Sequence, residues 1–191
     1  MSRLLVVFLL FLSCCASIPT KVTIDVNEIN TVNVDRILAK MKAIEFVGVE
    51  EVWFRITSHG GSVDEGYQLI DAIERYHVPT VCVIDFYGES MAAYIEEACD
   101  RSLITQRSFI MFHGASLGIN EKLNEDQLKS HLDWLMHLND SLAQYVSDRS
   151  GMDKKFFKLK TKRNWYLSPD EALKLHLVDG IITQWDIPES I

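Results

Sequence analysis

Apolar residues recur along this chain with two different periods, and each period predicts a different element. Residues 21–26 alternate between apolar and polar, which indicates a strand, whereas apolar residues recur every three or four positions over 34–44, which indicates a helix. The same succession of strand-like and helix-like segments continues to residue 112. Further strands are expected at 52–57, 81–86, 102–104 and 109–112, and helices over 63–77 and from Ser90 onward. This order predicts an α/β fold of repeated β-α units whose parallel strands are covered on both faces.

One helix-like segment, residues 123–148, is longer than the others, and its apolar residues extend beyond a single stripe. Its regular apolar positions are Leu128, Leu132, Leu135, Leu138, Leu142 and Tyr145, and Trp134 and Met136 lie on neighbouring faces. A helix that is apolar over more than one stripe usually packs on two sides. Two interpretations stay open, a core helix and a helix that forms a subunit interface.

The composition is that of one folded domain. The chain has 191 residues, of which 48% are hydrophobic and 24% charged, and no repeat or low-complexity linker divides it. The net charge of −8 argues against non-specific binding to nucleic acid, which needs a basic surface. The sequence has no phosphate-binding loop, dinucleotide-binding fingerprint or metal-ligand spacing, so no cofactor and no metal are expected.

The N-terminus has the pattern of an export signal. Arg3 precedes an unbroken apolar run, residues 4–12, which is too short for a membrane-spanning helix of about 20 residues. Small residues that suit a signal peptidase follow this run. We therefore expect residues 1–17 to be a signal peptide and residues 18–191 to form a single mature domain.

A second processing route fits the same segment. Leu12-Ser13-Cys14 is similar to a bacterial lipoprotein cleavage box, in which Cys14 would be the acylated residue. By either route the protein is expected to be exported to a periplasmic or other extracytoplasmic space. The membrane is a partner only through a lipid anchor at Cys14.

Two cysteines remain after removal of the signal. Cys82 lies in an apolar strand and Cys99 is expected late in the helix that follows Ser90. Free cysteine is among the most buried residue types, so we expect two buried thiols. A disulfide, which an oxidising compartment would allow, is the alternative.

Three short segments supply the residue types that acyl transfer requires. Gly60 and Gly61 can bare backbone N–H groups, Ser90 stands at a strand-to-helix turn, and His113 follows a buried strand. Serine attack on a carbonyl needs an alcohol, a base for its proton and donors for the oxyanion. Each residue also has a purely structural reading: a turn for the glycines, a helix cap for Ser90 and a buried neutral histidine for His113.

These segments resemble the Clp protease proteolytic subunit. The motifs are Ser-x-Gly-Gly-Ser-Val at 58–63, Ser-Met-x-Ala at 90–93 and Met-x-His at 111–113, and the segments 166–172 and 177–182 are similar to the family's closing part. The resemblance covers about residues 52–182. It implies a ClpP/crotonase-type fold with a long protruding handle helix, peptide hydrolysis, and assembly into homo-oligomeric rings. In that family the handle docks two rings, which favours the interface interpretation of residues 123–148.

The resemblance also implies a role for each residue of the site. Ser90 would be the nucleophile, His113 the general base, and the N–H groups of Gly61 and Met91 the oxyanion donors. Gly60 belongs to the loop that meets the substrate. His59 stands where the family usually has proline, and we expect its side chain to be able to reach the site.

The third member of the triad departs from the family. Counted back from Ser168, the position of the family's orienting aspartate is assigned to Lys160, which cannot accept the imidazole N–H. Three hypotheses follow: a Ser-His dyad or a substitute partner for His113, a desolvated Lys160 acting as base as in serine/lysine signal-peptide peptidases, and a catalytically impaired scaffold protein. The first is favoured. The candidate substitutes are Asp148, Asp153 and Asn164.

The sequence therefore predicts a serine-type endopeptidase that hydrolyses peptides or unfolded protein. An ATP-driven unfoldase partner is not expected, because ATP is not available outside the cytoplasm. An α/β-hydrolase esterase with His176 as base would leave the glycine pair and His113 without a role. The basic cluster between 154 and 163 is either a solvated face or the counterpart of an acidic patch, Glu96, Glu97 and Asp100, on a neighbouring subunit.

Overall fold

The centre of the protein is a parallel sheet. A computed structural model describes residues 20–45 and 47–190, so the expected signal peptide and Cys14 lie outside the described residues. Five strands run in the order β1-β2-β3-β4-β7, all parallel, which confirms the predicted α/β fold. Their bounds are β1 Lys21–Val26, β2 Glu51–Ser58, β3 Thr80–Glu89, β4 Arg101–Thr105 and β7 Gly180–Ile182.

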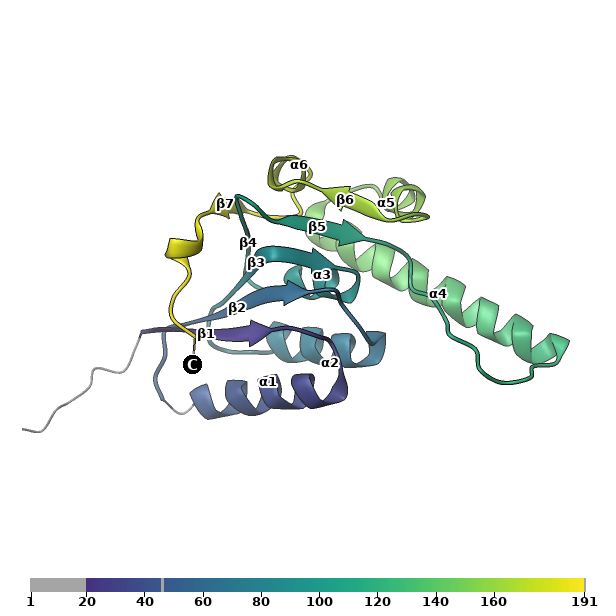
Figure 1. Ribbon diagram of the computed structural model, residues 1–191, viewed down its shortest axis with the longest axis horizontal. Coiled ribbons are helices and arrows are strands. Elements are labelled where there is room, and N and C mark those ends of the chain that lie inside the picture. The colour runs from purple at the N-terminus through teal and green to yellow at the C-terminus, as the bar shows by residue number, and fades with distance from the viewer. Residues whose placement is uncertain (1–19, 46, 191) are drawn as a thin grey trace, which may run out of the picture.

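On the edge away from β2, the strand β3 pairs with two strands. Its first half pairs with β4, and its last residues, Tyr87–Glu89, pair in parallel with β5 (Phe109–Phe112). Between the two halves Phe86 adopts φ 73°, and its N–H donates to the Ser108 hydroxyl at 2.7 Å. An antiparallel strand, β6 (Trp165–Leu167), covers the outer edge of β5. The two strand ends that precede Ser90 and His113 are therefore neighbours (Figure 1).

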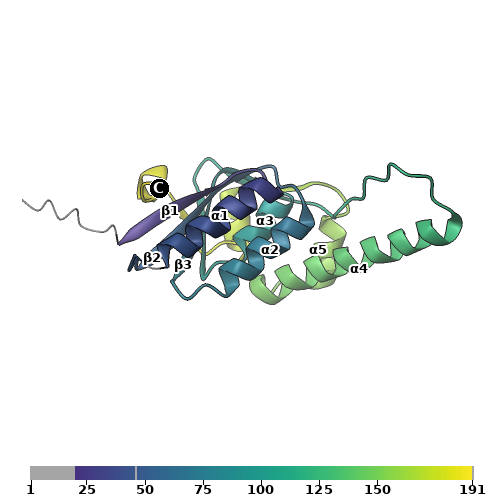
Figure 2. The ribbon, with the colours of Figure 1, turned by 90° about the horizontal axis from the view of Figure 1, so that it is seen from below.

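Both faces of the sheet are covered, as the apolar strands predict. The helices α1 (Thr31–Ile44), α2 (Val63–Glu74) and α3 (Met91–Glu96) cover one face, as Figure 2 shows from below. The main core between them includes Phe54, Ile56, Ile84 and Ile95. On the other face a smaller cluster of Trp53, Val81, Val83 and Leu103 packs against Ile182 and Ile187 of the C-terminal segment.

The longest helix, α4 (Glu125–Ser150), projects from the sheet. A capping box of Asn124 and Gln127 starts it, and Gly151 with φ 73° ends it. Its buried residues, Leu142, Ala143 and Val146, all lie in its C-terminal half. Its N-terminal half extends beyond the other elements and exposes Leu128, Leu132, Trp134 and Met136 (Figures 1 and 2). The core-helix interpretation is therefore wrong for that half, which the described part of the chain leaves uncovered.

The C-terminal segment contains short helices that the hydrophobic pattern did not predict. Asp153 caps α5 (Lys154–Lys160), so four of the six basic residues of the cluster are helical. Ser168 and Glu171 form a capping box at the start of α6 (Pro169–Lys174), and a 3-10 turn, η1, covers Gln184–Asp186. Among the described residues no helix combines the length and apolar character needed to cross a membrane.

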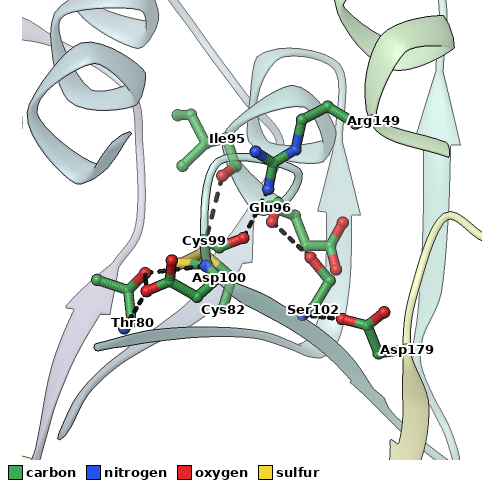
Figure 3. The surroundings of a disulfide bond; sticks show 9 residues. All are labelled: Thr80, Cys82, Ile95, Glu96, Cys99, Asp100, Ser102, Arg149 and Asp179. Atoms are coloured by element: carbon green, nitrogen blue, oxygen red, sulfur yellow. Dashed lines mark hydrogen bonds between the residues drawn. A yellow bond between two sulfur atoms is a disulfide. The ribbon is translucent and has the colours of Figure 1, made fainter. Parts of the chain in front are cut away.

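Cys82 and Cys99 form a disulfide, so the expectation of two free thiols is wrong (Figure 3). The helix α3 is only six residues long and ends at Glu96, so Cys99 lies in the turn that follows rather than late in the helix. The turn brings the chain back over β3, with a Cα–Cα distance of 5.5 Å between the two cysteines. Both residues are buried, as predicted.

Candidate active site

Ser90 occupies a strained turn between β3 and α3. Its φ of 54° and ψ of −126° are unusual for a residue with a side chain, and such values are typical of functional positions. The Ser90 N–H donates to the Met111 carbonyl at 2.8 Å, which ties the turn to β5. The Ser90 hydroxyl makes no capping hydrogen bond to α3. The helix-cap reading of this serine is therefore not supported.

The glycine loop packs directly against this turn. Gly60 and Gly61 adopt φ of 92° and 147°, which favour glycine. A Cβ added at Gly60 would lie 2.7 Å from the Glu89 carbonyl oxygen and 2.9 Å from the Met91 nitrogen. One at Gly61 would collide with the carbonyl of Ile29, whose N–H donates to the Gly60 carbonyl at 2.9 Å. The loop is held on both sides and leaves no room for side chains.

Two backbone N–H groups near the Ser90 turn are unpaired. Neither the N–H of Gly61 nor that of Met91 donates a hydrogen bond to another described residue. Gly61 pairs with Ile29 through hydrogen bonds made by the Gly60 carbonyl and the Ser62 N–H. Met91 is the first residue of α3, where helix N–H groups have no partner within the helix. Unpaired donors on two adjoining segments are what stabilisation of an oxyanion requires.

His113 is half-buried at the end of β5 and its ring is oriented by backbone. Its Nδ1 lies 2.7 Å from the Gly114 carbonyl oxygen. Because a carbonyl can only accept, Nδ1 carries the proton and Nε2 keeps its lone pair. Of the two ring nitrogens, Nε2 has no hydrogen-bond partner in the described part of the chain. The ring is therefore in the tautomer that a general base needs.

The structure brings Ser90 and His113 onto neighbouring strand ends but does not join their side chains. The Met111 carbonyl that accepts from Ser90 belongs to the residue two positions before His113. Over residues 20–45 and 47–190, no hydrogen bond links the Ser90 hydroxyl to the His113 ring. Such bonds are often open in free enzymes and tighten when substrate binds.

His113 opens onto a cleft of about 860 Å³. The cleft is enclosed by α4, by α5 and by the segment that follows β5. Tyr94, Leu135 and Phe157 line its apolar part. Asn139 fixes one wall, since its Oδ1 accepts from the Ala115 N–H at 2.7 Å and its Nδ2 donates to the Leu135 carbonyl at 3.0 Å. A volume of this size lies in the range of ligand-binding pockets.

Lys160 does not lie in this cleft. Its Nζ stands 5.4 Å from the ring centre of Phe156 and 5.6 Å from that of Trp165, and the residue is exposed. A lysine that serves as base must be desolvated so that its pKa falls, and an exposed ammonium is not. The structure therefore disfavours Lys160 both as base and as partner of His113.

Of the substitutes proposed for the third member, one lies in the right place. Asp153 is occupied as the cap of α5, and Asp148 accepts from Gln144 at 2.6 Å and lies outside the cleft. Asn164 lines the cleft together with His113. Among these three residues, Asn164 is therefore the one that shares a cavity with His113.

His59 lies beside the residue that precedes Ser90. Its ring stacks on Tyr87 at a centroid distance of 4.4 Å, and its Nδ1 is 2.7 Å from a carboxylate oxygen of Glu89. The side chain is 72% exposed and does not line the cleft. His59 is thus held on the outer surface of the glycine loop, apart from His113.

The contacts by which Tyr94 and Thr161 hold the cleft wall beside His113 were not predicted from the sequence. Tyr94 donates from its hydroxyl to the His113 backbone carbonyl at 3.1 Å, and the Gly114 N–H donates to the Thr161 carbonyl at 3.0 Å. The one signal for this wall is Asn139, a polar residue among the leucines of the long helix. Nothing in the local pattern distinguishes Tyr94 or Thr161.

Comparison with known proteins agrees with these features. The sequence profile of the Clp protease family matches residues 18–185. The chain is 30% identical to ATP-dependent Clp protease proteolytic subunit 2 of Parasynechococcus marenigrum over 153 residues, 78% of this chain and 76% of that protein. It is 30% identical over the same shares to proteolytic subunit 1 of Synechococcus sp. CC9902. It is 26% identical to proteolytic subunit 1 of Prochlorococcus marinus MIT 9312 over 160 residues, 81% and 80% of the two chains.

Proposed function

Because this chain belongs to the Clp protease family, we propose that it is an exported serine endopeptidase that hydrolyses peptides or unfolded protein. One observation carries the proposal: Ser90 is held at positive φ, with its hydroxyl unused by the fold, against two unpaired backbone N–H groups. A fold that needed only a helix start would not require a strained residue there. His113, with a free Nε2 on the neighbouring strand end, supplies the base.

The reaction follows from these groups. Ser90 Oγ attacks the peptide carbonyl carbon while His113 Nε2 takes its proton, and the N–H groups of Gly61 and Met91 stabilise the oxyanion. The imidazolium then returns the proton to the leaving amine, which leaves an acyl-enzyme. Water attacks this ester by the same route, and the acid product and free Ser90 are released.

The orienting acceptor of His113 is neutral in this proposal. The Gly114 carbonyl holds Nδ1–H, and Asn164 stands in the same cleft. A neutral acceptor fixes the tautomer but stabilises the imidazolium less than a carboxylate does. We therefore expect slow turnover compared with an enzyme that has a complete triad.

A fluorophosphonate probe tests the assignment, because it labels only activated serines. The parent protein is expected to gain one probe mass on the peptide that contains Ser90, and the Ser90→Ala variant none. The melting temperature of Ser90→Ala should match that of the parent, since the hydroxyl makes no capping bond. Parent protein that stays unlabelled at Ser90 would support the second candidate, a scaffold that kept the fold and lost activity.

We also propose that the protein is a homo-oligomer assembled in part through α4. The exposed side chains of Trp134 and Met136, 55% and 69% accessible, support this, since isolated chains rarely leave so much apolar surface on one helix. Light scattering at micromolar concentration should give a mass above that of one chain, and Trp134→Glu should lower it. A sharp monomer mass for the parent would contradict this assembly.

Export remains part of the proposal. The Cys82–Cys99 disulfide supports it, because such bonds persist in oxidising compartments and are rare in the cytosol. The curated relatives are named as ATP-dependent, whereas an exported copy would act without ATP, on short peptides or chains already unfolded. Mass determination of the protein recovered from its native compartment would show the N-terminal residue and any lipid on Cys14.

A further inference from the structure

The cleft beside His113 carries two cations that no described residue neutralises. Lys162 and Arg163 line it, and neither forms an ion pair with a described carboxylate. The backbone just before them is held by the hydrogen bond from the Gly114 N–H to the Thr161 carbonyl. Lys162 and Arg163 come directly after Thr161, which is bonded to Gly114, the residue next to His113.

Among the described residues, one carboxylate lines this cleft, and it is already occupied. Asp140 takes Lys154 on one oxygen at 2.6 Å and Lys158 on the other at 2.7 Å. These two hydrogen bonds lower the pKa of Asp140 to about 2, so it stays ionised and paired at neutral pH. With Asp140 neutralised, the cleft presents a net positive charge in a chain whose net charge is −8.

The expected acidic counterpart on a neighbouring subunit is not available. Glu96, the last residue of α3, and Glu97, which follows it, are buried, with 0% and 4% of their surface exposed. Asp100 accepts from the Thr80 N–H and hydroxyl at 2.8 and 2.9 Å. The alternative in which these three residues form a surface patch for the basic cluster is therefore wrong, and Lys162 and Arg163 are exposed and open to a ligand.

We propose that Arg163 and Lys162 select substrates that carry a carboxylate close to the scissile bond. The inference rests on the proposed peptidase function and names its substrate class. A guanidinium binds a carboxylate with two parallel hydrogen bonds, and Lys162 adds a second positive charge. Leu135 and Phe157 form an apolar wall of the same cleft. Two sources fit this chemistry, an acidic side chain and the free C-terminal carboxylate of a short peptide.

A matched set of fluorogenic peptides tests the proposal. Peptides of one sequence carry Glu, Gln or Lys next to the scissile bond, all with an amidated C-terminus, and a further Gln peptide has a free C-terminus. We expect kcat/KM to be about tenfold higher for Glu than for Gln, the size of one charge-assisted hydrogen bond. The preference should fall as salt rises. The Gln peptide with a free C-terminus shows whether the terminal carboxylate is read as well.

Variants connect the preference to these residues. Arg163→Gln should bring the Glu-to-Gln ratio close to one, and Arg163→Glu should favour the Lys peptide. Lys155→Gln is the matched control, because Lys155 belongs to the same basic cluster and lies outside the cleft. The ratio should stay at the parent value in this control.

The design separates this inference from the proposed function. If the parent cleaves the Gln and Glu peptides at equal rates, the carboxylate selectivity is wrong while the peptidase stands. If no peptide is cleaved, binding of the same peptides to the Ser90→Ala protein by fluorescence anisotropy still decides the selectivity. Tighter binding of the Glu peptide, lost in Ser90→Ala with Arg163→Gln, supports it, and equal affinities overturn it.

Discussion

Tyr94, which lies one turn of α3 after Ser90, donates a hydrogen bond of 3.1 Å from its hydroxyl to the backbone carbonyl of His113. The helix that starts after Ser90, the proposed nucleophile, thus holds the backbone of His113, the proposed base. Burial raises the pKa of Tyr94, so the hydroxyl stays protonated and remains a donor at any working pH. The ring also packs edge-on against Phe112 and Phe157, at centroid distances of 5.3 and 6.3 Å.

Tyr94→Phe is expected to lower kcat about fivefold, because one hydrogen bond of about 1 kcal/mol no longer positions His113. The ring contacts remain, so KM and the melting temperature should change little. Peptide turnover across pH gives a second readout. A shift in the pH dependence that His113 imposes indicates a positioning role, and an unchanged kcat would rule that role out.

Gly60→Ala is expected to abolish activity. Its Cβ would press on the backbone of Glu89 and Met91, and alanine disfavours the φ of 92°. The Ser90 turn or the glycine loop must then shift, which separates the oxyanion donors. Gly118→Ala is the control, since no atom lies within 4 Å of an added Cβ there. Fluorophosphonate labelling checks the result, and parent-like labelling of Gly60→Ala would contradict this account of the loop.

Asn164→Asp should raise kcat by placing a carboxylate in the cleft of His113. In the serine-protease template the corresponding carboxylate contributes about 10⁴-fold, which is an upper bound here. Lys160→Asp is the matched control, because Lys160 stands against Phe156 and Trp165 outside the cleft. Steady-state kinetics with one fluorogenic peptide measure kcat for the parent and for both variants. Activation by Lys160→Asp and not by Asn164→Asp would reverse the assignment.

The buried carboxyl of Glu97 should lower the free energy of unfolding as pH rises. Burial raises its pKa to about 8, although Arg149 acts to lower it. The folded state therefore keeps a proton that the unfolded chain loses above its ordinary pKa near 4.5. Between these two values each rise in pH favours the unfolded state, and above 8 the effect is complete. Glu97→Gln should then stabilise the protein by a few kcal/mol at pH 8.5 and little at pH 5.

Denaturant unfolding at the two pH values measures this difference. Glu121→Gln, at an exposed position, serves as the control and should change neither free energy of unfolding by more than about 0.5 kcal/mol. Equal effects of Glu97→Gln at pH 5 and 8.5 would show that the carboxyl is already ionised when folded.

The sequence predicts those parts of the site that short, regular segments position. Ser90, the glycine pair and His113 each lie at the end of a strand, and the strand boundaries follow from apolar periodicity. The third member of the triad could not be located in this way. The helix α5 ends at Lys160, and the turn from Thr161 to Asn164 decides which side chain faces the cleft. Turn geometry has no hydrophobic period, so counting residues back from Ser168 selected a side chain outside the cleft.

The disulfide was missed for a related reason. The segment Ala92–Ile95 favours a longer helix, which would have carried Cys99 away from β3. The helix stops at Glu96 instead, where the chain turns and the Arg149 side chain donates to the Cys99 carbonyl at 2.6 Å (Figure 3). That contact comes from a residue 50 positions later. Local propensity contains no information about it.

Cys82 precedes Ser90 and Cys99 follows it, so the disulfide closes a covalent ring of chain that contains Ser90. The strained turn at Ser90 is thus tied at both ends by a bond that heat and denaturant leave intact. A preparation made under reducing conditions would hold the same turn by packing alone. The redox history of a sample therefore determines how firmly the Ser90 turn is held, and protein prepared under oxidising conditions is the proper standard for an activity assay.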